Sequence, residues 1–130
     1  MKMQVSPKNL EEVLRSYLGL KYHLVGVKLI RNSVDGRGLL QPDTPMAFCQ
    51  MVRIVSISGE SFLYGLDHEK CPTAQVVLGF RDLKYFKIDW RVVPPETRKV
   101  LISPLSEINE VPEVVLAILT PKQMLSLIHI

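Results

Sequence analysis

Cys49, His68 and Cys71 carry the side chains of this 130-residue chain that are best suited to bind a metal or to act as a nucleophile. Cys71 directly precedes Pro72, and proline is favoured at the first position of a helix, so we expect Cys71 at a helix N-cap. Free amides and the helix dipole favour an anion there, so the helix should lower the pKa of the Cys71 thiol. Lys70 adds positive charge beside it, and His68 lies three residues earlier, close enough to share a ligand or a proton.

These residues support three different chemical functions. The first is a metal or cofactor site, because thiolate and imidazole suit zinc, copper(I) and iron–sulfur clusters. Cys49, Cys71 and His68 would be the metal ligands, and since structural zinc takes four ligands, a further one would come from Asp67, Glu69 or the missing C-terminal part. The second function is catalysis, with Cys71 as nucleophile and His68 as its base. The third is a redox pair of the two thiols.

A structural interpretation stands beside these chemical ones. Free cysteine is among the most buried residue types, and Cys49 lies in a segment rich in Met and Val, so both cysteines can pack in the core of an interaction module. Asp67 can form a turn with the amides that follow it. Gly36 and Gly38 do not make a phosphate loop, because the third glycine and the Gly-Lys-Ser/Thr ending are missing. Residue types alone leave the metal, enzyme and structural functions open.

Composition limits the class of protein. Hydrophobic residues make up 47% and charged residues 22%, which is typical of a globular domain rather than of a disordered chain. The net charge is only +3, and the cations near Arg81 are interleaved with acids, so we expect no nucleic-acid partner. No segment has the roughly 20 apolar residues that span a bilayer, and the first residues do not form a signal peptide. We therefore expect a cytoplasmic protein with reduced thiols that binds a small molecule or a metal.

The elements that must hold these side chains follow from hydrophobic spacing and from the positions of Ser, Pro and Gly. We expect helices over residues 7–18, 46–57, 72–78 and from 121, and strands over residues 22–30, 62–66, 100–103 and 114–119. Residues 31–45 are typical of a loop, and residues 81–98 of a mixed helix and loop segment. Short strands and helices without strict alternation predict an α+β fold, with a short mixed sheet and several packed helices.

The end of the chain differs from the rest. Residues 125–130, Leu-Ser-Leu-Ile-His-Ile, match the in-frame translation of a sequencing-adapter sequence. We therefore expect residues 1–124 to be a single but incomplete domain, truncated at its C-terminus, and residues 125–130 to be a non-native tail. His129 is for this reason not counted as a candidate ligand.

The most distinctive motifs lie around the two cysteines: Phe48-Cys49-Gln50, Gly59, Phe62, Asp67-His68 and Cys71-Pro72. Here the chain resembles the domain of unknown function 169 family of archaea and bacteria, over most of residues 10–124. Family members carry a proline just before the first strand core, where this chain has His23-Leu24, and they continue well beyond residue 124. The resemblance implies an α+β domain without an assigned biochemical role. It makes five residues the best candidates for a cofactor-binding site: Cys49, Gln50, Asp67, His68 and Cys71.

Overall fold

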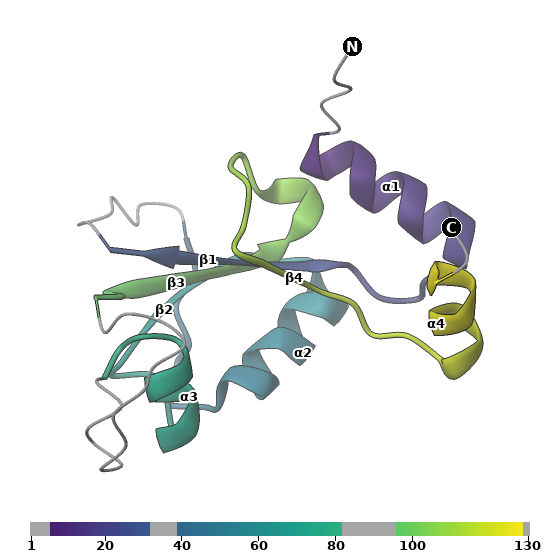
Figure 1. Ribbon diagram of the computed structural model, residues 1–130. Helices are drawn as coiled ribbons and strands as arrows, with labels where there is room; N and C mark the ends of the chain where they lie inside the picture. The colour runs from purple at the N-terminus through teal and green to yellow at the C-terminus, as the bar shows by residue number, and fades with distance from the viewer. Residues whose placement is uncertain (1–5, 32–38, 82–95, 129–130) are drawn as a thin grey trace.

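An antiparallel sheet forms the centre of the fold (Figure 1). The computed structural model describes residues 6–31, 39–81 and 96–128. Along the chain the elements are α1 (Pro7–Leu18), β1 (Val25–Ile30), α2 (Phe48–Ser58), β2 (Phe62–Gly65), α3 (Pro72–Val77), β3 (Lys99–Pro104), the 3-10 helix η2 (Leu105–Glu107), β4 (Val114–Leu116) and α4 (Pro121–Ile128). The strands lie in the order β2-β3-β1-β4. This arrangement confirms the predicted α+β fold.

The pairing within the sheet is simpler than the mixed sheet that we expected. All three strand pairs are antiparallel. In the described ranges, parallel pairing is limited to two isolated bridges, Leu40 with Phe62 and Met46 with Glu69. None of the helices in these ranges is long and apolar enough to cross a membrane.

One face of the sheet packs against α2. Val27 of β1 is paired with Ile102 of β3, and side chains alternate along a strand, so alternate residues of both strands point to the same side. Eight buried residues form this main core: Val25, Val27, Met51, Val55, Tyr64, Leu78, Val100 and Ile102. In Figure 1, α2 lies below the sheet, whereas α1 and η2 lie above it.

Caps and glycines set the ends of the helices as the sequence predicts. The Ser6 Oγ accepts a hydrogen bond from the Asn9 amide (3.2 Å) at the start of α1. Gly19 and Gly59 end α1 and α2 with φ angles of 64° and 73°. Any other residue would strain the backbone there, because a Cβ approaches the following carbonyl in the left-handed region. The predicted helix over residues 7–18 is therefore confirmed.

Two of the predicted strands are shorter in the structure, because of their hydrogen bonds to distant parts of the chain. β1 begins at Val25, later than predicted, because the Leu24 amide donates to the Glu11 carboxylate (3.1 Å) rather than to a neighbouring strand. β4 pairs only with the first three residues of β1, so it ends at Leu116 and not at residue 119. The number of β1 residues that pair with β4 thus sets the length of β4.

The remaining predictions agree with the structure within one or two residues. The second helix begins at Phe48 and not at residue 46, because Ala47 has an extended backbone (ψ 151°) and forms the N-cap, and the Met46 amide donates to the His68 carbonyl (2.9 Å). The predicted strands over residues 62–66 and 100–103, and the helices over 72–78 and from 121, correspond to β2, β3, α3 and α4. The predicted loop and the mixed segment lie in large part, at residues 32–38 and 82–95, outside the described ranges, as does His129.

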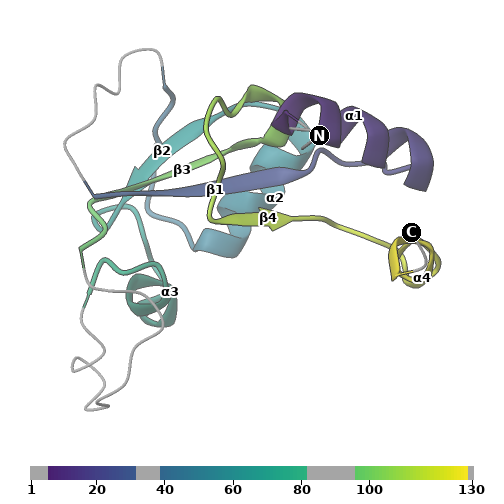
Figure 2. The same cartoon turned by 45° about the horizontal axis from the view of Figure 1, so that its top comes forward.

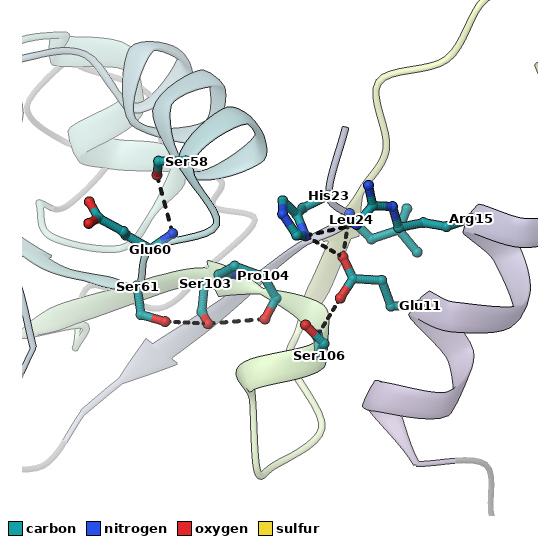
Figure 3. Close-up of polar contacts among 10 residues, drawn as sticks. All are labelled: Glu11, Arg15, His23, Leu24, Ser58, Glu60, Ser61, Ser103, Pro104 and Ser106. Atoms are coloured by element: carbon teal, nitrogen blue, oxygen red, sulfur yellow. Dashed lines mark hydrogen bonds and ion pairs between the residues drawn. The ribbon is translucent and has the colours of Figure 1, made fainter. Parts of the chain in front are cut away.

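Glu11 ties α1 to the rest of the fold (Figure 3). It is only 2% exposed, and its carboxylate accepts hydrogen bonds from the amides of Leu24 (3.1 Å) and Ser106 (2.8 Å). The His23 Nδ1 lies 3.1 Å from Glu11 Oε1, and Arg15 Nη1 lies 3.2 Å from the same ring nitrogen. Burial by itself raises the pKa of Glu11, but the hydrogen bonds from Ser106 and the contact with His23 outweigh it and lower that pKa. The charged carboxylate therefore fixes the position of the first helix.

Candidate functional site

The starts of α2 and α3 are held side by side, although they lie far apart in the sequence. Met46, just before α2, and Glu69, just before α3, pair in a parallel bridge. The Met46 amide donates to the His68 carbonyl (2.9 Å), and the Met46 carbonyl accepts from the Lys70 amide (3.3 Å). Both helices lie on the same side of the sheet (Figure 1). We refer to residues 46 and 68–70 as the helix-start anchor.

The two cysteines follow directly from the helix-start anchor. Cys49 lies in the first turn of α2, three residues after Met46, and it is exposed. Cys71 is the N-cap residue of α3, as predicted, and it is half-buried. The prediction that both cysteines pack in the core is therefore wrong for Cys49. Each free thiol lies within about one helical turn of the pairing between the two segments.

Glu69 is the residue that joins the two helix starts. It is 4% exposed, and its Oε1 accepts a hydrogen bond from the Cys71 amide (2.8 Å). In the part of the chain that the structure describes, its Oε2 is buried without a hydrogen-bond partner. Burial raises the pKa of Glu69, although the amides of Cys71, Phe48 and Lys70 lower it in part. Sequence reasoning treated Glu69 only as a spare ligand, although its position just before a Cys-Pro helix start suits an acidic cap.

His68 has one ring nitrogen already engaged. Its Nδ1 accepts a hydrogen bond from the Gly65 amide (3.2 Å), and its ring stacks on Tyr64 with the ring centroids 6.3 Å apart. Because Nδ1 acts as an acceptor, a neutral His68 carries its proton on Nε2. Neither nitrogen of the neutral ring then has a lone pair for a metal or for the proton of Cys71.

Gln50 and Asp67, the other two predicted site residues, make local contacts. The Gln50 Oε1 accepts a hydrogen bond from the Ala47 amide (2.9 Å), so this side chain caps its own helix. The Asp67 side chain is 71% exposed, and its Oδ1 lies 3.7 Å from His68 Nδ1 and 3.8 Å from Lys99 Nζ. An ion pair this exposed contributes little to stability. Gln50 thus caps the start of α2, whereas Asp67 makes only exposed contacts in the turn before α3.

The donor atoms near the helix-start anchor are few. Among residues 6–31, 39–81 and 96–128, no group of three or more His, Cys, Asp or Glu side chains is arranged to hold a metal ion. Cys49, His68 and Cys71 are therefore not gathered into one three-ligand cluster. Next to the anchor in the sequence lie an exposed cysteine, a half-buried cysteine and a buried glutamate.

Among the comparisons with known proteins, one with family models finds a match, and it agrees with the family resemblance seen in the sequence. The sequence model of a family described as "Uncharacterised ArCR", domain of unknown function 169, matches residues 13–91. This range covers more than half of the chain and contains all five predicted site residues. No curated protein and no solved structure matches the chain.

Proposed function

Because the chain belongs to the domain of unknown function 169 family, whose members are uncharacterised, we propose a function from the residues themselves. We propose that it is a binding domain that holds a soft metal ion of the copper(I) class between the thiolates of Cys49 and Cys71. A reducing cytoplasmic setting belongs to the same proposal, because oxidation of either thiol removes a ligand.

The observation that carries this proposal is the pairing of Met46 with Glu69. It anchors two helix starts to each other, and each of them presents a free cysteine within its first residues. The exposed Cys49 and the half-buried Cys71 are both open to an incoming ligand.

The kind of metal follows from the number and softness of the donors. Thiolates are soft ligands and select copper(I), zinc and iron–sulfur clusters. Structural zinc takes four ligands, and iron–sulfur clusters are held by four cysteines, so a two-thiolate site suits neither within one chain. Copper(I) accepts two sulfur ligands without further donors. We leave His68 out of the ligand set because its Nδ1 already accepts the Gly65 amide.

Anaerobic titration with copper(I) against a coloured competing chelator tests the proposal. We expect one ion per chain for the wild type, and a loss of more than about tenfold in affinity for both Cys49→Ser and Cys71→Ser. His68→Gln is the matched control, and it should bind like the wild type. Circular dichroism of each variant reports whether it is folded. Folded cysteine variants that keep the wild-type affinity would overturn the proposal.

An interaction module is a second candidate, favoured by the apolar surface around β4. Val111, Val114, Val115 and Ile118 are between 44% and 80% exposed. Exposed apolar side chains on and beside an edge strand can mark a contact site. Analytical ultracentrifugation tests it, because a protein that contacts a second copy through this surface sediments as a dimer, and Val114→Lys should then shift it toward the monomer. If the wild type sediments as a monomer, self-association through this surface is excluded.

A further inference from the structure

A groove of about 500 Å³ lies on the face of the sheet that α2 does not cover. Its floor contains Lys28 and Ile30 of β1 and Leu101 and Ser103 of β3. These residues alternate with the core residues of the same strands, so they point away from α2. The volume is in the range of about 300–1,000 Å³ that is usual for small-molecule sites.

The chain after η2 forms one wall of the groove. Figures 1 and 2 show this chain, in green, on the side of the sheet opposite α2. Gly26 of β1 allows the close approach, because a Cβ at this position would collide with Ile108 Cδ1 and touch Pro112. The wall therefore lies directly on the strand, with Ile108, Asn109 and Glu110 facing the groove.

Two serine hydroxyls at the groove are hydrogen-bonded to each other. The Ser103 Oγ donates to the Pro104 carbonyl (3.0 Å), and it lies 2.7 Å from the Ser61 Oγ (Figure 3). With the single Ser103 proton on the Pro104 carbonyl, Ser61 is the donor in the bond between the two serines. Ser61, which lines the groove, can therefore only accept a further hydrogen bond from a ligand.

Two acids and two bases line the groove, and one of the bases is already paired with an acid outside the lining. Lys28 Nζ is paired with Glu113 Oε1 (3.2 Å) and is also bound to the Val111 carbonyl (3.4 Å). The remaining charged residues of the lining are Glu107, Glu110 and Arg31, two acids against one base. Both glutamates are exposed, so they can meet a ligand without rearranging the core.

We propose that this groove binds a small organic amine, with its apolar body on Leu101, Ile30 and Ile108 and its ammonium group toward Glu107 and Glu110. An ammonium group offers only donors, which matches the carboxylates and the acceptor-only Ser61. The site is separate from the two cysteines, and the proposal does not depend on metal binding.

Three probes that share a phenethyl group test the proposal: phenethylamine, 2-phenylethanol and 3-phenylpropionate. We expect the amine to bind most tightly and to shift the backbone amide resonances of Ser61, Leu101 and Asn109. The double variant Glu107→Gln, Glu110→Gln should weaken amine binding about two- to twenty-fivefold, because each exposed ion pair contributes about 1.4- to fivefold, and should leave the alcohol unchanged. Cys71→Ser is the control, and it should bind the amine like the wild type.

Either of two results would overturn the proposal. One is that the carboxylate binds as tightly as the amine. The other is that the double variant, folded by circular dichroism, keeps the full affinity for the amine. Because both replaced residues are exposed, the double variant is expected to unfold at the same urea concentration as the wild type.

Discussion

His68 Nδ1 lies 3.2 Å from the backbone nitrogen of Gly65 and accepts its hydrogen. This bond places the proton of the neutral ring on Nε2. The bond therefore distinguishes between two roles for His68 that the sequence left open, a base for Cys71 and a structural residue of the turn. A histidine that activates Cys71 must accept the thiol proton, whereas the bond to Gly65 makes His68 part of the turn between β2 and α3.

The first prediction concerns the reactivity of Cys71 with iodoacetamide. His68→Gln should leave the rate and its pH dependence unchanged, because His68 does not take the thiol proton. Mass spectrometry after partial labelling reports Cys49 and Cys71 separately, and Cys71→Ser provides the reference for Cys49 alone. A loss of reactivity at Cys71 only, in folded His68→Gln protein, would instead support the thiol enzyme.

A second prediction concerns the buried carboxylate of Glu11. Glu11→Gln should lower the free energy of unfolding by about 2 kcal/mol, because the charged acceptor of the Leu24 and Ser106 amides is lost. Urea denaturation measures this change. Glu12→Gln, an exposed position on the same helix, should stay within about 0.5 kcal/mol of the wild type. Equal effects of the two substitutions would show that Glu11 does not anchor α1.

The third prediction is a dependence of stability on pH. The pKa of Glu11 is lowered in the folded state, so its contribution is present above the unfolded pKa and is lost as pH falls through the folded pKa. Between about pH 7 and about pH 3, the wild type should therefore lose more stability than Glu11→Gln. The pKa of Glu69 is raised, which gives the opposite slope, but this slope is common to both proteins and cancels in their difference. Identical losses for the two proteins contradict the role of Glu11.

Local signals in the sequence were sufficient for much of the fold. Ser6 and Gly19 mark the ends of α1, and Cys71-Pro72 marks the start of α3, because caps depend on neighbouring residues. The role of Glu11 depends on Ser106, 95 residues away, which no local pattern reveals. A signal was nevertheless present, since Glu11 stands in the apolar stripe of its helix with Leu14 and Leu18.

The candidate site was predictable only in part, for the same reason. The N-cap position of Cys71 is local and was predicted correctly. The partner of His68 Nδ1 is a backbone amide, and this bond leaves no pattern of residue types. Gln50, in contrast, stands at the N3 position of α2, where Gln commonly bonds the N-cap amide. The joining of the two helix starts through Glu69 depends on tertiary packing.

A fourth prediction compares two glycines that both adopt the left-handed conformation. Gly19→Ala should cost about 1 kcal/mol, from backbone strain alone, because nothing lies within 4 Å of the added Cβ. Gly59→Ala should cost about 2 kcal/mol, since its Cβ would also lie 3.0 Å from His23 Nε2. Urea midpoints of the two variants give the difference. If Gly19→Ala proves the more damaging, the contact between Gly59 and His23 does not shape the fold.

X-ray absorption at the copper edge of the anaerobically loaded protein tests the central claim most directly. If the two thiolates are the ligands, we expect two sulfur atoms in the first coordination shell of copper and no scattering from imidazole. In Cys49→Ser we expect one of these sulfur atoms to be lost. A first shell with a histidine nitrogen, or one unchanged by removal of either cysteine, would contradict a metal site between the starts of α2 and α3.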